Sequence, residues 1–136
     1  MEKYNLPNDF KVFCVTAKSF PDGIKEAWEK LHKMLPTTEG RTFYGISYGD
    51  GKGGIIYQAA VTESFEGEAE KYGCESFTIK KGEYLTEPIT DYMKNIETIG
   101  TTFQRLLADP RLDSNSYCLE WYKNDREMFC MVKINS

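Results

Sequence analysis

A repeated order of secondary structure constrains the fold of this 136-residue chain more than any other feature. In each half, the sequence predicts a strand, a helix and two further strands. The letters repeat as well, because residues 44–48 (YGISY) align with residues 117–121 (YCLEW), and each segment precedes a turn and an apolar strand. On this alignment Glu120 takes the position of Ser47.

Neither half is large enough to bury much apolar surface alone. We therefore expect one domain over residues 1–136, with repeat halves at roughly 10–63 and 74–134. The expected fold class is α+β, with two strand-helix-strand-strand units related by pseudo-two-fold symmetry. A mostly antiparallel, curved sheet would carry two main helices, and the two units would close a cleft along their seam.

Apolar periodicity and turn residues mark the individual elements. Apolar residues recur at helical spacing between Ile24 and Leu35, with Asp22 as the expected N-cap and Pro36 as the stop. Gly100 inside the second helix predicts a close backbone approach. In chain order, the elements that we predict are a strand over 10–17, a helix over 23–35, strands over 42–48 and 55–63, an acidic surface connector over 64–73, a strand over 74–85 bent at Gly82, a helix over 91–108, and strands over 117–122 and 128–134.

The charge and hydropathy of the chain exclude two classes of partner. The net charge is −4 and Lys and Arg do not cluster, which argues against direct binding of nucleic acid. No apolar run approaches the ~20 residues of a membrane span, and residues 1–7 lack the apolar core of a signal peptide. We therefore expect a cytoplasmic protein.

The sequence predicts neither a metal site nor a bound cofactor. Cys14, Cys74, Cys118 and Cys130 are widely spaced, form no C-x-x-C pair, and are expected to be small buried residues. The glycine-rich loop 49–54 joins two strands and has no Ser or Thr after its Lys, which is unlike a phosphate-binding loop.

Glu120 is the candidate functional residue. Strand alternation places Cys118, Glu120 and Tyr122 on one face, and Tyr117, Leu119 and Trp121 on the other. Both faces are apolar, so we expect the Glu120 carboxylate to be at least partly buried. A buried carboxylate requires a partner or attracts a cation. A ligand anchor and a salt bridge to a neighbouring Lys or Arg are the two alternatives.

Four segments occur in the order and spacing of a known family, namely Tyr44-Gly45-Ile46, residues 57–61 (YQAAV), residues 79–84 (IKKGEY) and residues 119–122 (LEWY). From residue 10 to 134 the chain resembles the GyrI-like small-molecule-binding domains, which also form the effector-binding halves of AraC-type and MerR-type multidrug-sensing regulators. It departs from the family's common Ile-Pro-Ile ending, with Lys133 in place of the proline. Without a helix-turn-helix region, it resembles a stand-alone member rather than a transcription factor.

The resemblance implies that Glu120 is the acidic anchor of an aromatic cleft that takes lipophilic, cationic compounds. Cation–π contacts with the cleft's rings would add ~0.5–2 kcal/mol each. The candidate rings are those of Tyr48, Tyr57, Tyr84 and Tyr122, and Trp28 of the first helix is expected to line one side of the cleft. For each ring, core packing is the alternative.

The resemblance also implies an enzymatic alternative, because some stand-alone relatives hydrolyse reactive cyclopropane-bearing compounds with a glutamate and a tyrosine. Glu120 would then act as general base, with Tyr57 or Tyr84 as proton donor. The rest of the catalytic inventory is thin, since His32 lies beside an apolar stripe and Ser47 has no histidine placed for a triad. Binding of a small hydrophobic or cationic ligand is therefore the main hypothesis. A second alternative is a protein-interaction modulator whose protein partner contacts the acidic connector, residues 63–70.

Overall fold

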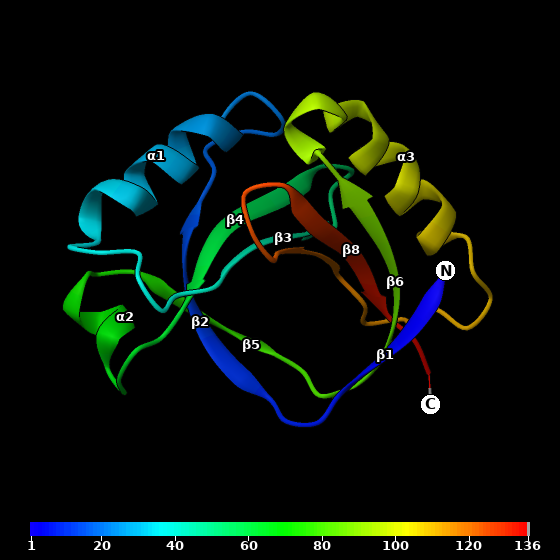
Figure 1. The fold of residues 1–136 in the computed structure, drawn as a ribbon, viewed down its shortest axis with the longest axis horizontal. Helices are drawn as coiled ribbons and strands as arrows, with labels where there is room; N and C mark the ends of the chain where they lie inside the picture. Colours follow the sequence, from blue (N-terminus) through cyan, green and yellow to red (C-terminus); the bar gives the residue numbers. More distant parts are fainter. Residues whose placement is uncertain (136) are drawn as a thin grey trace. The chain divides into compact units, whose positions relative to one another are not determined.

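The computed structural model describes residues 1–135 and divides the chain into two compact units. The α1 unit spans Phe10–Ile79, and the α3 unit combines Met1–Asp9 with the chain from Lys80 on (Figure 1). The elements are β1 (Glu2–Leu6), β2 (Phe10–Thr16), α1 (Ile24–Met34), β3 (Phe43–Gly49), β4 (Ile55–Thr62), α2 (Glu68–Lys71), β5 (Glu75–Ile79), β6 (Gly82–Thr90), the 3₁₀ turn η1 (Tyr92–Lys94), α3 (Ile96–Leu107), β7 (Cys118–Tyr122) and β8 (Glu127–Lys133).

Both units have the same strand order, which confirms the predicted α+β class and its duplication. The α1 unit orders its antiparallel strands β5-β2-β4-β3, and the α3 unit orders its own β1-β6-β8-β7. The register repeats too, because Ser47 faces Tyr57 and Glu120 faces Cys130 at the same sequence offset. The alignment of Glu120 with Ser47 therefore holds in the structure.

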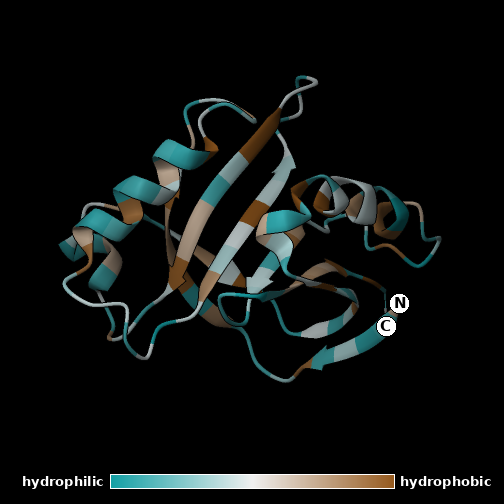
Figure 2. Ribbon diagram, turned by 45° about the horizontal axis from the view of Figure 1, so that its top comes forward, coloured by the Kyte–Doolittle hydropathy of each residue, from teal (hydrophilic) through white to brown (hydrophobic). Residues whose placement is uncertain are grey.

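Each unit buries one side of its sheet under one helix. In the α1 unit, Ala27 and Leu31 of α1 pack on Phe13, Val15, Ala59 and Val61 of the strands. In the α3 unit, Phe103 and Leu106 of α3 pack on Leu85, Ile89, Met128, Cys130 and Val132. Figure 2 shows hydrophobic residues interspersed among hydrophilic ones along α1, as a helix with one buried stripe requires.

The sheet of the α1 unit is curved, as predicted. Tyr48 of β3 and Phe77 of β5 stack with their ring centroids 6.4 Å apart. β4 and β2 lie between these strands in the sheet, and neighbouring strands are ~4.8 Å apart. The two rings meet only because the sheet curls around the face that points away from α1.

The edge strands differ from the prediction. The strand expected over 74–85 is two strands, because β5 ends at Ile79 and β6 begins at Gly82, where φ is +132°. β5 pairs with β2 in the α1 unit, whereas β6 belongs to the α3 unit. The N-terminal strand β1, which pairs with β6, was not predicted at all. Its side chains are mostly exposed and lack an apolar alternation that would reveal a strand.

Three smaller predictions are also wrong. Helix α1 begins after Gly23 rather than Asp22, and a Cβ at Gly23 would meet the Ser19 backbone nitrogen at 2.8 Å. The second helix starts later than expected, with η1 preceding α3. At Gly100, no atom of a neighbouring element in the described chain lies within 4 Å of an added Cβ, so no close approach occurs there. None of the helices in residues 1–135 is long and apolar enough to cross a membrane.

Candidate functional site

Glu120 lies on β7, on the sheet face that α3 covers. The register sets Glu120 opposite Cys130 and Tyr122 opposite Met128. Cys130 and Met128 belong to the core under α3, so strand alternation turns Glu120 and Tyr122 to the same side. Trp121 points to the other face, where its ring stacks on Phe129 at 5.1 Å. The face predicted for Glu120 is therefore confirmed, and its side chain is half-buried.

The Glu120 carboxylate is held by a phenol. The Tyr122 hydroxyl donates a hydrogen bond to Oε1 of Glu120 at 2.7 Å. The Tyr92 ring meets the Tyr122 ring edge-on, with centroids 5.2 Å apart. Burial raises the pKa of the Tyr92 hydroxyl, and the charge of Asp125 adds to this effect. The α3 unit thus provides a carboxylate beside two aromatic rings.

Glu87 and Glu120 flank Cys130 in one cross-strand row. β8 pairs Cys130 with Glu87 on one side and with Glu120 on the other. Arg105 of α3 forms an ion pair with Glu87, at 2.6 Å from Nη2 to Oε2. Burial raises the pKa of the Cys130 thiol, and the charge of Glu120 raises it further. Together Glu87, Glu120 and Arg105 carry one net negative charge when ionised, which favours a cation at this face.

The α1 unit has its own aromatic group on the face that α1 covers. Trp28 Nε1 donates a hydrogen bond to the Tyr57 hydroxyl at 3.1 Å, and Tyr57 is only 4% exposed. The ring of Phe43 lies 6.1 Å from Trp28, and that of Phe20 lies 6.3 Å from Tyr57. Trp28 and Tyr57, which the sequence predicted as ligand contacts, are therefore brought together within this unit.

Tyr48 and Tyr84 each lie on the sheet face that the helix of their unit does not cover. Tyr48 is one residue beyond Ser47, so it points away from α1 and stacks on Phe77. Tyr84 pairs with Lys133 and is fully buried, and its hydroxyl donates to the Lys80 carbonyl at 2.6 Å. Burial raises the pKa of this hydroxyl strongly. Neither ring shares a face with the helix-side groups of its unit, so Tyr84 lies on the other side of the α3-unit sheet from Glu120.

The other candidate groups contribute little chemistry. His32 is exposed and stacks on Phe43 at 4.8 Å. The register pairs Cys118 with Val132 and Cys130 with Glu120, so the two cysteines do not face each other across the strands. In residues 1–135, no group of three or more His, Cys, Asp or Glu side chains is arranged to hold a metal ion.

The acidic connector is more ordered than the sequence predicted. It contains α2, and the side chain of Glu68 is only 1% exposed. Arg41 binds Glu68 through two hydrogen bonds, of 2.9 Å and 2.5 Å. Arg41 lowers the pKa of the Glu68 carboxyl, mainly through this pairing. A buried ion pair therefore fixes a segment that we expected to be a solvated loop.

Sequence reasoning missed Glu87 and Arg105 at the α3-side face. A signal was present, because Leu85, Glu87 and Ile89 alternate along β6, and Leu85 and Ile89 are buried under α3. Extending the strand pattern past residue 85 would have placed Glu87 on the core side.

Comparison with known proteins supports the fold. No family model matches the sequence, and no curated protein matches it significantly. Among solved structures, an integron cassette protein from the mobile metagenome of Vibrio cholerae is similar, with a TM-score of 0.75 and 16% identity, covering 98% of this chain and 95% of that one. A hydrolase from Listeria innocua is also similar, with a TM-score of 0.61 and 13% identity, covering 98% and 90%. At these identities the likeness extends to the fold alone, and the GyrI-like resemblance remains an interpretation of the sequence.

Proposed function

We propose that this chain is a small-molecule-binding protein that takes lipophilic, cationic compounds against Glu120. The observation that carries this function is the half-buried Glu120 carboxylate, which accepts a hydrogen bond from Tyr122 at 2.7 Å and lies opposite the fully buried Cys130. The Tyr122 hydroxyl orients the carboxylate without neutralising its charge. A cation is the ligand that such a group favours.

Electrostatics supports a cation of modest affinity. Two unit charges 4 Å apart attract by about 4 kcal/mol at the effective dielectric constant of a partly buried site. The rings of Tyr92 and Tyr122 offer cation–π contacts of ~0.5–1 kcal/mol each. Arg105 compensates the charge of Glu87, and the Glu120 carboxylate adds a negative charge at the same face. Trp28 and Tyr57 stay predicted ligand contacts of the α1 unit.

Isothermal titration of the full chain with tetraphenylphosphonium tests this function. Tetraphenylborate has nearly the same size and shape but opposite charge, and it should bind much more weakly. Glu120→Gln should weaken phosphonium binding at least about tenfold, a loss of ~1.4 kcal/mol, because it keeps the shape and removes the charge. Glu2→Gln is the matched control, since Glu2 is an exposed strand carboxylate in the same unit.

The melting temperature separates a ligand anchor from a structural role. For a ligand anchor, Glu120→Gln leaves the melting temperature unchanged or raises it while phosphonium binding falls. A fall of several degrees with unchanged binding would mean that Glu120 stabilises the fold instead.

Hydrolysis is the second candidate, because the resemblance implies ring opening by a glutamate and a tyrosine, and Glu120 and Tyr122 are hydrogen-bonded to each other. One similar structure is described as a hydrolase. Glu120 would take a proton from the attacking water, and a tyrosine hydroxyl would return a proton to the opened ring. Mass spectrometry after incubation with an electrophilic cyclopropane compound should then show a product heavier by one water. Equal product with Glu120→Gln would reject this activity.

A further inference from the structure

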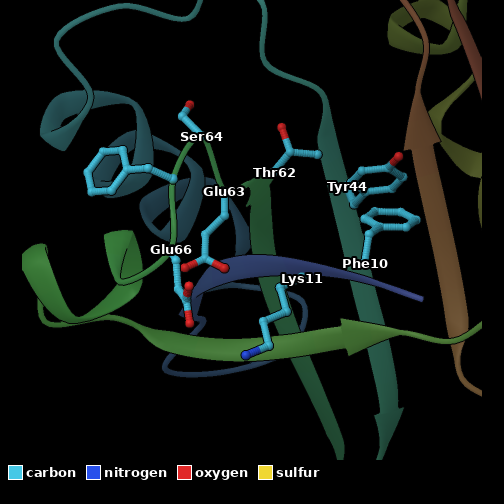
Figure 3. Close-up of a pocket in the computed structure, with 8 residues that line it drawn as sticks. Phe10, Lys11, Tyr44, Thr62, Glu63, Ser64 and Glu66 are labelled. Carbon is cyan, nitrogen blue, oxygen red and sulfur yellow. The ribbon is translucent and has the colours of Figure 1, made fainter. Parts of the chain in front are cut away.

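A depression lies entirely within the α1 unit. It has a volume of about 710 Å³ and opens between the ends of three strands and the loop that follows β4 (Figure 3). This volume falls within the range of small-molecule sites. Its lining residues are Phe10, Lys11, Tyr44, Thr62, Glu63, Ser64, Phe65 and Glu66.

Aromatic rings form one side of this depression. The rings of Phe10 and Tyr44 pack at a tilt, with centroids 5.6 Å apart. Both side chains are half-buried, so part of each ring surface is open. On the loop side, Phe65 is 49% exposed. An apolar or cationic group that enters the depression can therefore contact aromatic ring surface.

Carboxylates supply the charge. Glu63 and Glu66 line the same depression, and in Figure 3 their side chains extend toward the same part of it. Lys11 contributes one positive charge, and in this view its ammonium points away from the two labelled rings. Two carboxylates against one ammonium leave the lining negative, which favours a cationic ligand.

The loop wall is fixed by the buried Arg41–Glu68 pair. Glu68 Oε1 accepts a hydrogen bond from the Ser64 backbone N–H at 2.8 Å. Arg41 Nη1 donates to the Thr62 carbonyl at 3.2 Å. The Glu63 N–H is bonded to the Lys11 carbonyl at 3.4 Å. The backbone of residues 62–64, which includes Glu63, is therefore held before a ligand arrives, so little ordering entropy is lost there on binding.

We propose that this depression is a binding site for a small organic cation whose charged centre carries compact apolar groups, such as a quaternary ammonium. The rings of Phe10 and Tyr44 contact the apolar groups, and Glu63 and Glu66 balance the charge. The site consists of α1-unit residues alone and includes none of the residues around Glu120. Binding here goes beyond the function proposed above and can fail or hold independently of it.

Choline and its uncharged carbon isostere, 3,3-dimethyl-1-butanol, test the site in the full chain. Amide resonances are followed by two-dimensional NMR at low ionic strength, where surface charges are screened least. Choline should shift the amides of Phe10, Tyr44 and residues 62–66 along one saturable curve. The uncharged isostere should shift them much less. Equal shifts with both compounds would show an apolar depression without preference for a cation and would overturn the proposal.

Substitutions of the lining residues test which of them contribute to choline binding. The double variant Glu63→Gln and Glu66→Gln should weaken choline about tenfold, because both surface carboxylates lose their charge. Glu70→Gln is the matched control, since Glu70 is exposed on the same segment but does not line the depression, and it should leave binding unchanged. Phe10→Leu should weaken choline about threefold while the melting temperature shows that the variant is folded.

The outcome separates this site from the one at Glu120. Glu120→Gln should leave the choline shifts at residues 62–66 unchanged. Choline shifts that persist in the Glu63→Gln and Glu66→Gln variant, or that disappear in Glu120→Gln, would refute the α1-unit site. Neither result bears on tetraphenylphosphonium binding, which tests Glu120 separately.

Discussion

Replacement of Arg41 by Met should destabilise the α1 unit strongly. The substitution keeps most of the side-chain length but leaves the Glu68 carboxylate, whose side chain is 1% exposed, without its cation. Glu68 would lose two hydrogen bonds from Arg41 and keep the one from the Ser64 N–H. Removing one partner of a buried ion pair costs about 3–5 kcal/mol. For a chain of 136 residues, this lowers the melting temperature by roughly 10–17 °C.

The loss of stability in Arg41→Met should become smaller as the pH is lowered. In the native chain, pairing lowers the pKa of Glu68 below its ordinary value of 4.5, so this stabilisation is present above pH 4.5 and is lost as the pH falls through the lowered pKa. In Arg41→Met, burial without a cation raises the pKa of Glu68, and protonation of its carboxylate removes the destabilising buried charge. The stability difference between the two proteins should therefore narrow as the pH is lowered from about 7 toward 4.

Urea unfolding followed by tryptophan fluorescence measures this difference. The chain has two tryptophans, Trp28 in the α1 unit and Trp121 in the α3 unit. In a Trp121→Phe background, Trp28 reports the α1 unit alone. Comparison with the chain that keeps both tryptophans also tests whether the two units unfold together as one domain, because coincident transitions indicate a single cooperative step.

A double replacement serves as the control. Arg41→Met with Glu68→Leu removes both charges and should recover most of the lost stability, because an apolar pair of similar volume often replaces a buried ion pair without loss. The same variant loses the bonds that hold Ser64 and Thr62, so choline binding should weaken although the fold is retained. A loss of less than ~1 kcal/mol in Arg41→Met would contradict the burial of this pair, since exposed pairs contribute at that level.

Three further predictions concern the α3 unit and the buried thiols. Tyr122→Phe removes the hydroxyl that orients Glu120. It should lower the stability measured by urea unfolding by ~1 kcal/mol and weaken the binding of tetraphenylphosphonium. An unchanged affinity would show that the Tyr122 hydroxyl does not contribute to the ligand site. Arg105→Gln removes the cation that is paired with Glu87, so a second negative charge becomes available for a ligand. Titration calorimetry should then show that the affinity for a bis-quaternary ammonium rises several-fold more than the affinity for a monocation. Equal rises for both ligands would argue against a charge-compensating role of Arg105. Burial raises the pKa of Cys14 to about 12 and also raises that of Cys130. Both thiols should therefore react with iodoacetamide at least about a hundredfold more slowly in the native chain than in urea, as mass spectrometry of the alkylated peptides would show.

Local patterns predicted the parts of the fold that repeat. Helical spacing between Ile24 and Leu35 located the buried stripe of α1, and the alternation around Glu120 located its face. Both signals are local, because periodicity depends only on which side of an element is buried. The alignment of Glu120 with Ser47 was predicted from letters and is repeated in the strand register.

Pairings between distant segments could not be read from the sequence. β1 and β5 pair with strands far from them in sequence, and β1 has no apolar alternation. The Arg41–Glu68 pair joins side chains 27 residues apart, and a run of glutamates is typical of a solvated loop. The face of Tyr48, by contrast, could have been predicted from the sequence. Strand alternation puts Tyr48 on the opposite face from Ser47, which is the residue that aligns with Glu120.

The central claim is that Glu120 receives a cation. A crystal structure of the chain with bound tetraphenylphosphonium tests it most directly. We predict the phosphonium on the α3-covered face of β7, with its rings against Tyr92 and Tyr122 and its charge within a few ångströms of the Glu120 carboxylate, about the distance over which such a charge pair is strong. A phosphonium bound only between Phe10 and Glu66, or a Glu120 carboxylate held by a Lys or Arg in the complex, would contradict the account.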